Sequence, residues 1–265
     1  SFIVKGLYPN IRPCKDSQMN NPTAAMIVIG DEILSGRTRD SNMHYLAKEL
    51  VKVGVSLKEV RIISDDQEEI ILSTNELRKK FNYVFTSGGI GPTHDDITAD
   101  SIAKAFKVKI GVRSDAKNLL TKYYKQNGIE LNSSRIRMAR IPDTAELIEN
   151  TISGAPGFKI ENVFVMAGVP SIFQSMVDVT LTNMKHGSPL KSKSIILNLP
   201  EGEIAEKLKA MASENPEFSF GSYPFFRDGI LGTDIVIRGH NMKIIEILAQ
   251  KVRETFSIKT ESDDE

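Results

Sequence analysis

The chain has 265 residues, of which 40% are hydrophobic and 26% are charged, an ordinary composition for a globular protein. Its 34 lysines and arginines balance its 34 aspartates and glutamates, so the overall charge does not favour a nucleic acid or a membrane surface as partner. The single cysteine, Cys14, excludes an intrachain disulfide and indicates a reducing compartment. No apolar run approaches the roughly 18 residues of a spanning helix, and we expect a cytoplasmic protein.

The two ends of the chain differ from its middle. We interpret residues 1–22 as an N-terminal extension, because residues 1–18 carry three basic residues against one acid and lack the long apolar core of a secretory signal. This segment is either an artificial addition or the remnant of an organelle presequence, and the second reading would place the protein in an organelle. Residues 257–265, rich in serine and acids, are predicted to be a disordered tail.

The first half of the chain alternates predicted strands and helices. Apolar runs predict strands at 24–29, 55–63 and 81–86. Helices are predicted between them, one at 66–80 and one whose apolar face consists of Met43, Leu46, Ala47, Leu50 and Val51. This order predicts right-handed crossovers and an α/β fold with a doubly wound, mostly parallel sheet between two helical layers. Ligands of such sheets bind outside the carboxyl ends of the strands.

The second half completes this domain and adds a smaller one. Further helices are predicted at 98–106, 115–127 and 171–184, with a buried strand at 163–166. We therefore expect one three-layer domain over residues 23–186. Residues 190–256 predict a small α+β domain of βαββα order, with strands at 194–199, 218–222 and 233–238 and helices at 201–213 and 242–256.

The most informative motif runs from Ser87 to Asp96 and directly follows the third predicted strand. Three glycines in four positions let the backbone turn tightly and approach a ligand closely. Successive backbone N–H groups in such a turn can form a nest for a phosphate. The candidate phosphate-binding residues are therefore Ser87, Gly88, Gly89, Gly91 and Thr93. A solvated Gly-Pro loop is the alternative interpretation.

Carboxylates near this loop predict a divalent cation, because they repel a phosphate unless a cation lies between them. Asp95 and Asp96 follow the glycines, and Asp31 and Glu32 follow the first strand. Carboxylates, phosphate oxygens and water together suit ions of the Mg²⁺ type. Asp40 is a further candidate, with a helix N-cap as its alternative role.

Three arginines before Pro142 form a second group of candidates. They predict a bidentate phosphate clamp, with a surface charge cluster as the alternative: Arg135, Arg137 and Arg140. The segment from Asn150 to Phe158 suits a pocket wall or a plain hairpin. His94 is a candidate metal ligand or acid–base group, or an ordinary loop histidine.

Five separated motifs resemble the MoaB/Mog-like molybdopterin-binding fold as it occurs at the N-terminus of CinA competence/damage-inducible proteins. They are Gly30–Gly36, Asp40–Asn42, Gly88–Thr98, Gly154–Phe158 and Ala167–Pro170. The resemblance covers about residues 23–185. Residues 190–256 are similar to the companion region of short relatives and of eukaryotic FAD synthases. The C-terminal deamidase domain of full-length CinA proteins has no counterpart here, so nicotinamide mononucleotide deamidation is not expected.

The resemblance implies two activities. Mog-type members bind molybdopterin and help to adenylylate it or to insert metal, and they carry a threonine and an arginine where Ile90 and Asp95 stand here. CinA-type members are similar to pyrophosphatases that split ADP-ribose or FAD with a divalent metal (Mg, Mn or Co) and potassium. The Gly-Pro-Thr-His-Asp-Asp form of residues 91–96 matches that branch.

We therefore expect a nucleotide pyrophosphatase that forms a homo-oligomer, a dimer or trimer. In this interpretation Asp96 holds the metal with Asp31 or Glu32, and Asp95 or His94 positions the attacking water. Two further ligand-binding candidates come from the family motifs, Asn42 and Gly157. A molybdopterin-binding or adenylylating protein is the alternative, and a non-catalytic nucleotide-binding module is the third.

Overall fold

The computed structural model describes residues 21–256. The chain divides into two compact units whose boundary lies between Ser188 and Pro189, and each is described by itself. Except for Asn21 and Pro22, the predicted extension at 1–22 lies outside the described residues, and so does the predicted tail at 257–265. Among the described residues no helix has the length and apolar character needed to cross a membrane.

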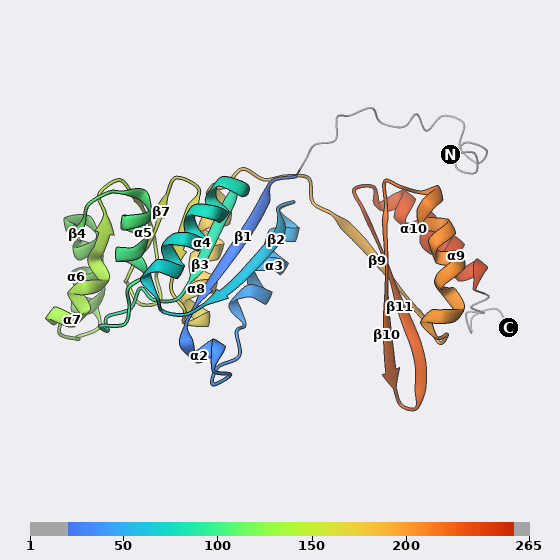
Figure 1. The fold of residues 1–265 in the computed structure, drawn as a ribbon, viewed down its shortest axis with the longest axis horizontal. Helices are drawn as coiled ribbons and strands as arrows, with labels where there is room; N and C mark the ends of the chain where they lie inside the picture. The colour runs from blue at the N-terminus through green and yellow to red at the C-terminus, as the bar shows by residue number, and fades with distance from the viewer. Residues whose placement is uncertain (1–20, 257–265) are drawn as a thin grey trace. The chain divides into compact units, whose positions relative to one another are not determined.

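The first unit is built on a six-stranded sheet with the order β2-β1-β3-β8-β7-β6 (Figure 1). The strands are β1 (Thr23–Ile29), β2 (Ser56–Ile63), β3 (Tyr83–Ser87), β6 (Glu146–Ile148), β7 (Gly157–Ile160) and β8 (Val163–Met166). The first three and β8 run parallel, whereas β6 and β7 extend the sheet antiparallel. The predicted α/β fold with a mostly parallel sheet is therefore confirmed. Two short strands, β4 (Ile110–Val112) and β5 (Arg140–Pro142), pair apart from this sheet.

Strand β1 lies at the centre of the core because both of its faces are apolar and buried. Ala25, Ile27 and Ile29 belong to one cluster, and the alternate residues belong to the other. Helices α4 (Gln67–Lys80), α5 (Thr98–Phe106) and α6 (Ser114–Gln126) contribute to the first cluster. Helices α3 (Asn42–Lys52) and α8 (Pro170–Asn183) contribute to the second. The sheet thus has helices on both faces, as the strand–helix alternation predicts.

The predicted apolar face of α3 was partly wrong. Met43 and Val51 are 38% and 50% exposed. The predicted Leu46 and Leu50 are buried, and the third buried residue of the helix is Asn42, so the three are spaced four apart. This rotation of the helix turns the polar Asn42 inward, toward the ends of the strands.

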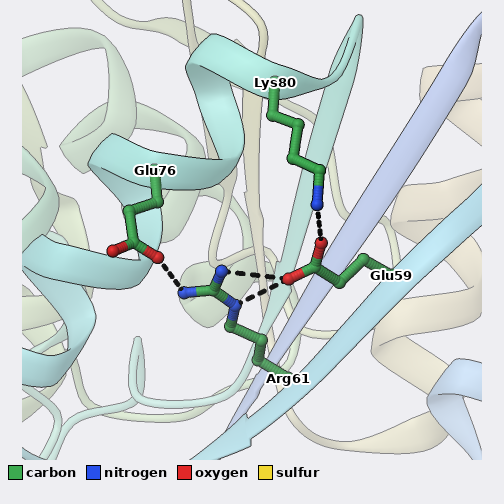
Figure 2. Close-up of polar contacts among 4 residues, drawn as sticks. All are labelled: Glu59, Arg61, Glu76 and Lys80. Carbon is green, nitrogen blue, oxygen red and sulfur yellow. Dashed lines mark hydrogen bonds and ion pairs between the residues drawn. The ribbon is translucent and has the colours of Figure 1, made fainter.

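Strand β2 is an outer strand of the sheet, and a chain of ion pairs covers one side of it (Figure 2). Arg61 bonds to Glu76 of α4 at 2.6 Å and to Glu59 at 2.9 Å, and Lys80 bonds to Glu59 at 2.6 Å. Lys80 first, and then Arg61, lower the pKa of the Glu59 carboxyl. Charged residues on an edge strand disfavour pairing with another chain, and such surface pairs add little to stability.

The second unit has a three-stranded antiparallel sheet with the order β10-β11-β9. Its elements are β9 (Lys191–Leu197), α9 (Glu201–Glu214), β10 (Ser219–Arg227), β11 (Ile230–Gly239) and α10 (Met242–Thr255). The predicted βαββα order is confirmed. Ile204 and Leu248 of the helices pack with Ile195, Ile235 and Ile237 of the strands. The β10–β11 hairpin is longer than predicted, because its strands pair up to the turn at Asp228-Gly229.

Candidate functional site

The ends of three parallel strands bring the predicted loops to one edge of the sheet. Strands β1 and β3 are parallel neighbours, with Val28 opposite Ser87. Strand β8 lies beside β3, and the Gly88 N–H donates to the Met166 carbonyl at 3.1 Å. A Cβ on Gly168 would lie 3.2 Å from the Gly88 Cα. The loops after Ile29 and Ser87 therefore lie at one edge of the sheet, as expected for loops at the carboxyl ends of neighbouring parallel strands.

The glycine loop has the tight backbone that its sequence predicts. Gly88 and Gly89 have φ values of +110° and +67°, which side-chain-bearing residues rarely adopt. A Cβ on Gly88 would overlap the Ile29 carbonyl oxygen, and one on Gly89 would overlap the Thr98 hydroxyl. The loop is therefore pressed against the protein on one side, and packing alone already requires glycine at both positions.

Asn42 connects the start of α3 to the ends of β3 and β8. Its side-chain Nδ2 donates to the Ser87 hydroxyl at 2.8 Å and to the Gly168 carbonyl at 2.7 Å. The residue is 4% exposed, and its Oδ1 has no hydrogen-bond partner within residues 21–256. The Asp40 carboxylate accepts from the N–H groups of Asn42 and Met43 at 3.3 and 3.0 Å, which is the N-cap alternative for Asp40.

Acidic side chains gather at the same edge, and Asp65 is a member that the sequence analysis missed. Asp65 Oδ2 accepts from the Asp31 N–H at 3.0 Å. Burial raises the pKa of Asp65, and the charges of Asp31, Glu32 and Asp95 raise it further, against the lowering effect of that hydrogen bond. We call these four residues the acidic cluster. They follow β1, β2 and β3, so parallel pairing of β2 with β1 is the signal that could have revealed Asp65.

The two adjacent loop acids, Asp95 and Asp96, have different surroundings. Asp96 Oδ2 accepts from the Thr93 N–H at 2.8 Å and from the Thr93 hydroxyl at 2.6 Å. The nearby Thr93 hydroxyl also lowers the pKa of Asp95, with a smaller contribution from His94. The loop charge that reaches Asp65 is that of Asp95. We therefore assign Asp95 to the acidic cluster, and the role of Asp96 as a metal ligand stays a prediction.

His94 extends into solvent beside Asp95. Its side chain is 99% exposed, with Nδ1 3.8 Å from Asp95 Oδ1. Within the described part of the chain, no three side chains among histidine, cysteine, aspartate and glutamate are arranged to hold a metal ion by themselves. A cation at the acidic cluster would therefore need further ligands from substrate and water.

A narrow pocket lies on the other side of Asp96. Its walls come from the glycine loop, α5, the 137–141 segment and β7, and include Ile90, Gly91, Asp96, Asp100, Arg137 and Arg140. Arg140 forms an ion pair with Asp100. The 150–156 segment is the connection of the β6–β7 hairpin, and it also supplies Pro156 to the pocket wall. The segment is therefore both a hairpin connection and part of a pocket wall, the two roles that the sequence offers for it.

Arg135 and Gly157, two of the predicted ligand-binding residues, lie outside both this pocket and the glycine loop. The Arg135 guanidinium donates to the Glu130 carbonyl and stacks over the Tyr124 ring, with 5.1 Å between Cζ and the ring centre. Gly157 belongs to β7, where a Cβ would lie 2.5 Å from the Val165 carbonyl oxygen. Gly157 is thus required by sheet packing, and the neighbouring Phe158 lines the pocket instead.

The raised pKa of Asp65 gives a testable dependence of stability on pH. The folded state holds the Asp65 proton more tightly than the unfolded chain does, so stability falls as pH rises from the ordinary value of about 3.9 through the raised pKa. Asp65→Asn keeps an acceptor for the Asp31 N–H and removes the carboxylate whose ionisation lowers the stability of the folded state. We expect the variant to gain at most about 0.5 kcal/mol at neutral pH, because solvent screens the cluster.

Urea unfolding of both proteins at pH 3.5 and pH 7, without divalent metal, measures this effect. The advantage of the variant should be present at pH 7 and absent at pH 3.5. An advantage at pH 3.5 alone, or a variant less stable at pH 7, would contradict the assignment of Asp65 to the cluster.

Comparison with known proteins agrees with this architecture. Residues 25–186 match the family described as "Probable molybdopterin binding domain", and residues 189–265 match the one described as "FAD synthase, middle domain". The chain belongs to the molybdopterin-binding domain family. The predicted MoaB/Mog-like identity of the first unit is therefore confirmed.

Relatives of this molybdopterin-binding domain protein include both CinA and FAD synthase chains. A protein of Archaeoglobus fulgidus is 33% identical over 200 residues, which are 75% of this chain and 84% of the relative. A "Probable FAD synthase" of Caenorhabditis elegans is 29% identical over 259 residues, 89% of this chain and 50% of the relative. This chain thus spans about half the length of the FAD synthase. The crystal structure of CinA from Thermoplasma acidophilum has 29% sequence identity to this chain and a TM-score of 0.56. The match covers 61% of this chain and 98% of the CinA chain.

Proposed function

We propose that the first unit hydrolyses the pyrophosphate bond of a nucleotide ligand such as ADP-ribose or FAD, with a divalent metal. The observation that carries this proposal is the meeting of a glycine loop and the acidic cluster at one sheet edge. The N–H groups of Gly88 and Thr93 donate within the protein, so the loop donors to a phosphate would be those of Gly89, Ile90 and Gly91. The carboxylates nearby would repel that phosphate unless a cation lay between them.

The donors of the acidic cluster fit a hard divalent ion. Asp31, Glu32, Asp65 and Asp95 offer carboxylate oxygens. Burial is the main cause that raises the pKa of Asp65, and the charges of the other three acids add to it, a repulsion that a cation would relieve. Mg²⁺ and Mn²⁺ are commonly held by one or two carboxylates together with substrate phosphates and water. Such an ion, when bound, neutralises phosphate charge and activates water. Potassium is a second proposed requirement, implied by the likeness to the CinA branch.

The residues of this chain prepare the site in three ways. Asn42 fixes the ends of β3 and β8 to one another, and Thr93 with Asp96 holds the loop closed. The Asp95 carboxylate is charged at neutral pH, and the Thr93 hydroxyl lowers its pKa further, so it can accept a hydrogen bond from an attacking water. His94 is almost fully exposed and is the weaker candidate for this role.

Turnover with purified protein tests the proposal. We expect AMP to be released from ADP-ribose or FAD in the presence of Mg²⁺, Mn²⁺ or Co²⁺, and release to stop when EDTA is added. Potassium and sodium are compared in parallel. Absence of AMP with all three metals, or equal release in EDTA, would contradict the proposed function.

A second candidate function is the binding or adenylylation of molybdopterin. The family match over residues 25–186 favours it. Ile90 and Asp95 disfavour it, since Mog-type relatives carry threonine and arginine at these positions. Fluorescence of pterin released from purified protein would support this candidate, and its absence alongside AMP release would support the hydrolase.

A further inference from the structure

We propose that Arg137 determines the substrate class of this site, by binding the second phosphate of ligands that carry two linked phosphates. This inference rests on the proposed function, because it takes the glycine loop as the place of the first phosphate. It predicts discrimination between nucleoside diphosphates and monophosphates.

Three neighbouring arginines have similar sequence surroundings but different contacts. Arg135 is occupied by the Glu130 carbonyl and the Tyr124 ring. Arg140 is occupied by the Asp100 carboxylate. The Arg137 side chain is exposed, lines the narrow pocket, and forms no ion pair or hydrogen bond with any residue in 21–256. Arg137 is therefore the one of the three whose whole guanidinium is free of partners in residues 21–256 and open to an external anion.

The pocket wall carries two arginines and two aspartates, and Arg137 is the basic side chain that no acid pairs with in residues 21–256. Two carboxylates also line the pocket, but Asp100 is paired with Arg140, and Asp96 accepts two hydrogen bonds from Thr93. Arg140 Nε is buried and has no partner within the described residues. Asp96 and Arg137 are thus the two charged groups of this wall without an oppositely charged partner among the described residues, and of these the Arg137 guanidinium, whose planar fork matches phosphate oxygens, is the one that can bind an anion.

The position and size of the pocket indicate which group binds there. Gly91 belongs both to the glycine loop and to the pocket wall, so a phosphate on the loop has the pocket as its neighbour. The remaining walls include Met138, Ile141 and Phe158, which leave room for little more than a small group. A nucleobase is too large for this space. A second phosphate directly linked to the first is the small anionic group that we place beside Arg137.

Binding of ADP and AMP to the wild-type protein and to Arg137→Ala tests the inference by calorimetry with Mg²⁺. The wild type should bind ADP more tightly than AMP. Loss of a charge-assisted phosphate contact should weaken ADP binding by about 10- to 100-fold and leave AMP binding within about threefold. Arg135→Ala is the matched control and should leave both affinities unchanged. Arg137→Lys keeps the charge without the fork and should restore part of the ADP affinity.

Four outcomes would overturn the inference: equal wild-type affinity for ADP and AMP, no loss of ADP affinity in Arg137→Ala, equal losses for both nucleotides, or the same loss in Arg135→Ala. Thermal unfolding of each variant confirms that the folded protein is compared. Because binding is measured without turnover, a wild type that prefers ADP but releases no AMP from ADP-ribose would contradict the proposed hydrolysis and support the role of Arg137.

Discussion

Gly89→Ala should be much less stable than Gly128→Ala, although the two glycines have nearly the same φ, +67° and +66°. Alanine at either position has the strain of a left-handed backbone, about 1–2 kcal/mol. A Cβ on Gly89 would also overlap the hydroxyl of Thr98, a residue that is fully buried, whereas one on Gly128 would have no heavy atom within 4 Å in the described part of the chain. This overlap should add about 1–3 kcal/mol, measured by urea unfolding.

The same pair of variants separates packing from ligand binding. In the folded fraction, Gly89→Ala should show little or no ADP binding, because the displaced loop no longer presents its N–H groups. Gly128→Ala should bind ADP as the wild type does. Equal losses of stability would show that Thr98 moves aside at little cost. Unchanged ADP affinity in Gly89→Ala would make the glycine loop a structural connector.

Asp95→Asn should lower AMP release by about 100-fold or more and raise the metal concentration needed for half-maximal rate. The substitution removes one carboxylate charge from the proposed cation site, and the bound cation stabilises the transition state. The neighbouring Asp96→Asn is the matched variant. Its amide oxygen can still accept the Thr93 hydrogen bonds, so its loss at saturating metal should be smaller. Initial rates over a range of Mn²⁺ concentrations measure both effects.

Thr93→Val completes this comparison. It removes the hydroxyl donor to Asp96 and leaves both carboxylates in place. A greater loss of rate in Asp96→Asn than in Asp95→Asn would support Asp96 as the metal ligand, which is what the sequence pattern alone predicts. Near-wild-type rates in both aspartate variants would contradict a catalytic role for these carboxylates.

The sheet was predictable because its central strands are continuous apolar runs. Both faces of β1 are buried, and that requirement shows directly in the sequence from Ala24 to Ile29. Strands β6 and β7 have three and four residues, too few to show a period, and were not predicted. The face of α3 was misjudged because the polar Asn42 points inward to bond with Ser87, which composition does not reveal.

The candidate site was predicted in outline and corrected in detail for a similar reason. The glycine loop is a local motif, so its residues could be named from spacing. The separate surroundings of Asp95 and Asp96, and of Arg135 and Arg137, depend on partners distant in sequence or on backbone direction. Asp65 lies outside any motif and joins the cluster only through the parallel pairing of β2 with β1.

The central claim is that a cation couples the acidic cluster to a phosphate on the glycine loop. The most direct measurement is calorimetric titration with a non-hydrolysable analogue, α,β-methylene ADP, with and without Mn²⁺. Coupling of this kind should raise the affinity for the analogue by about tenfold or more when Mn²⁺ is present, and Asp65→Asn should reduce that gain. Equal affinity with and without Mn²⁺, or tighter binding in its absence, would contradict the claim.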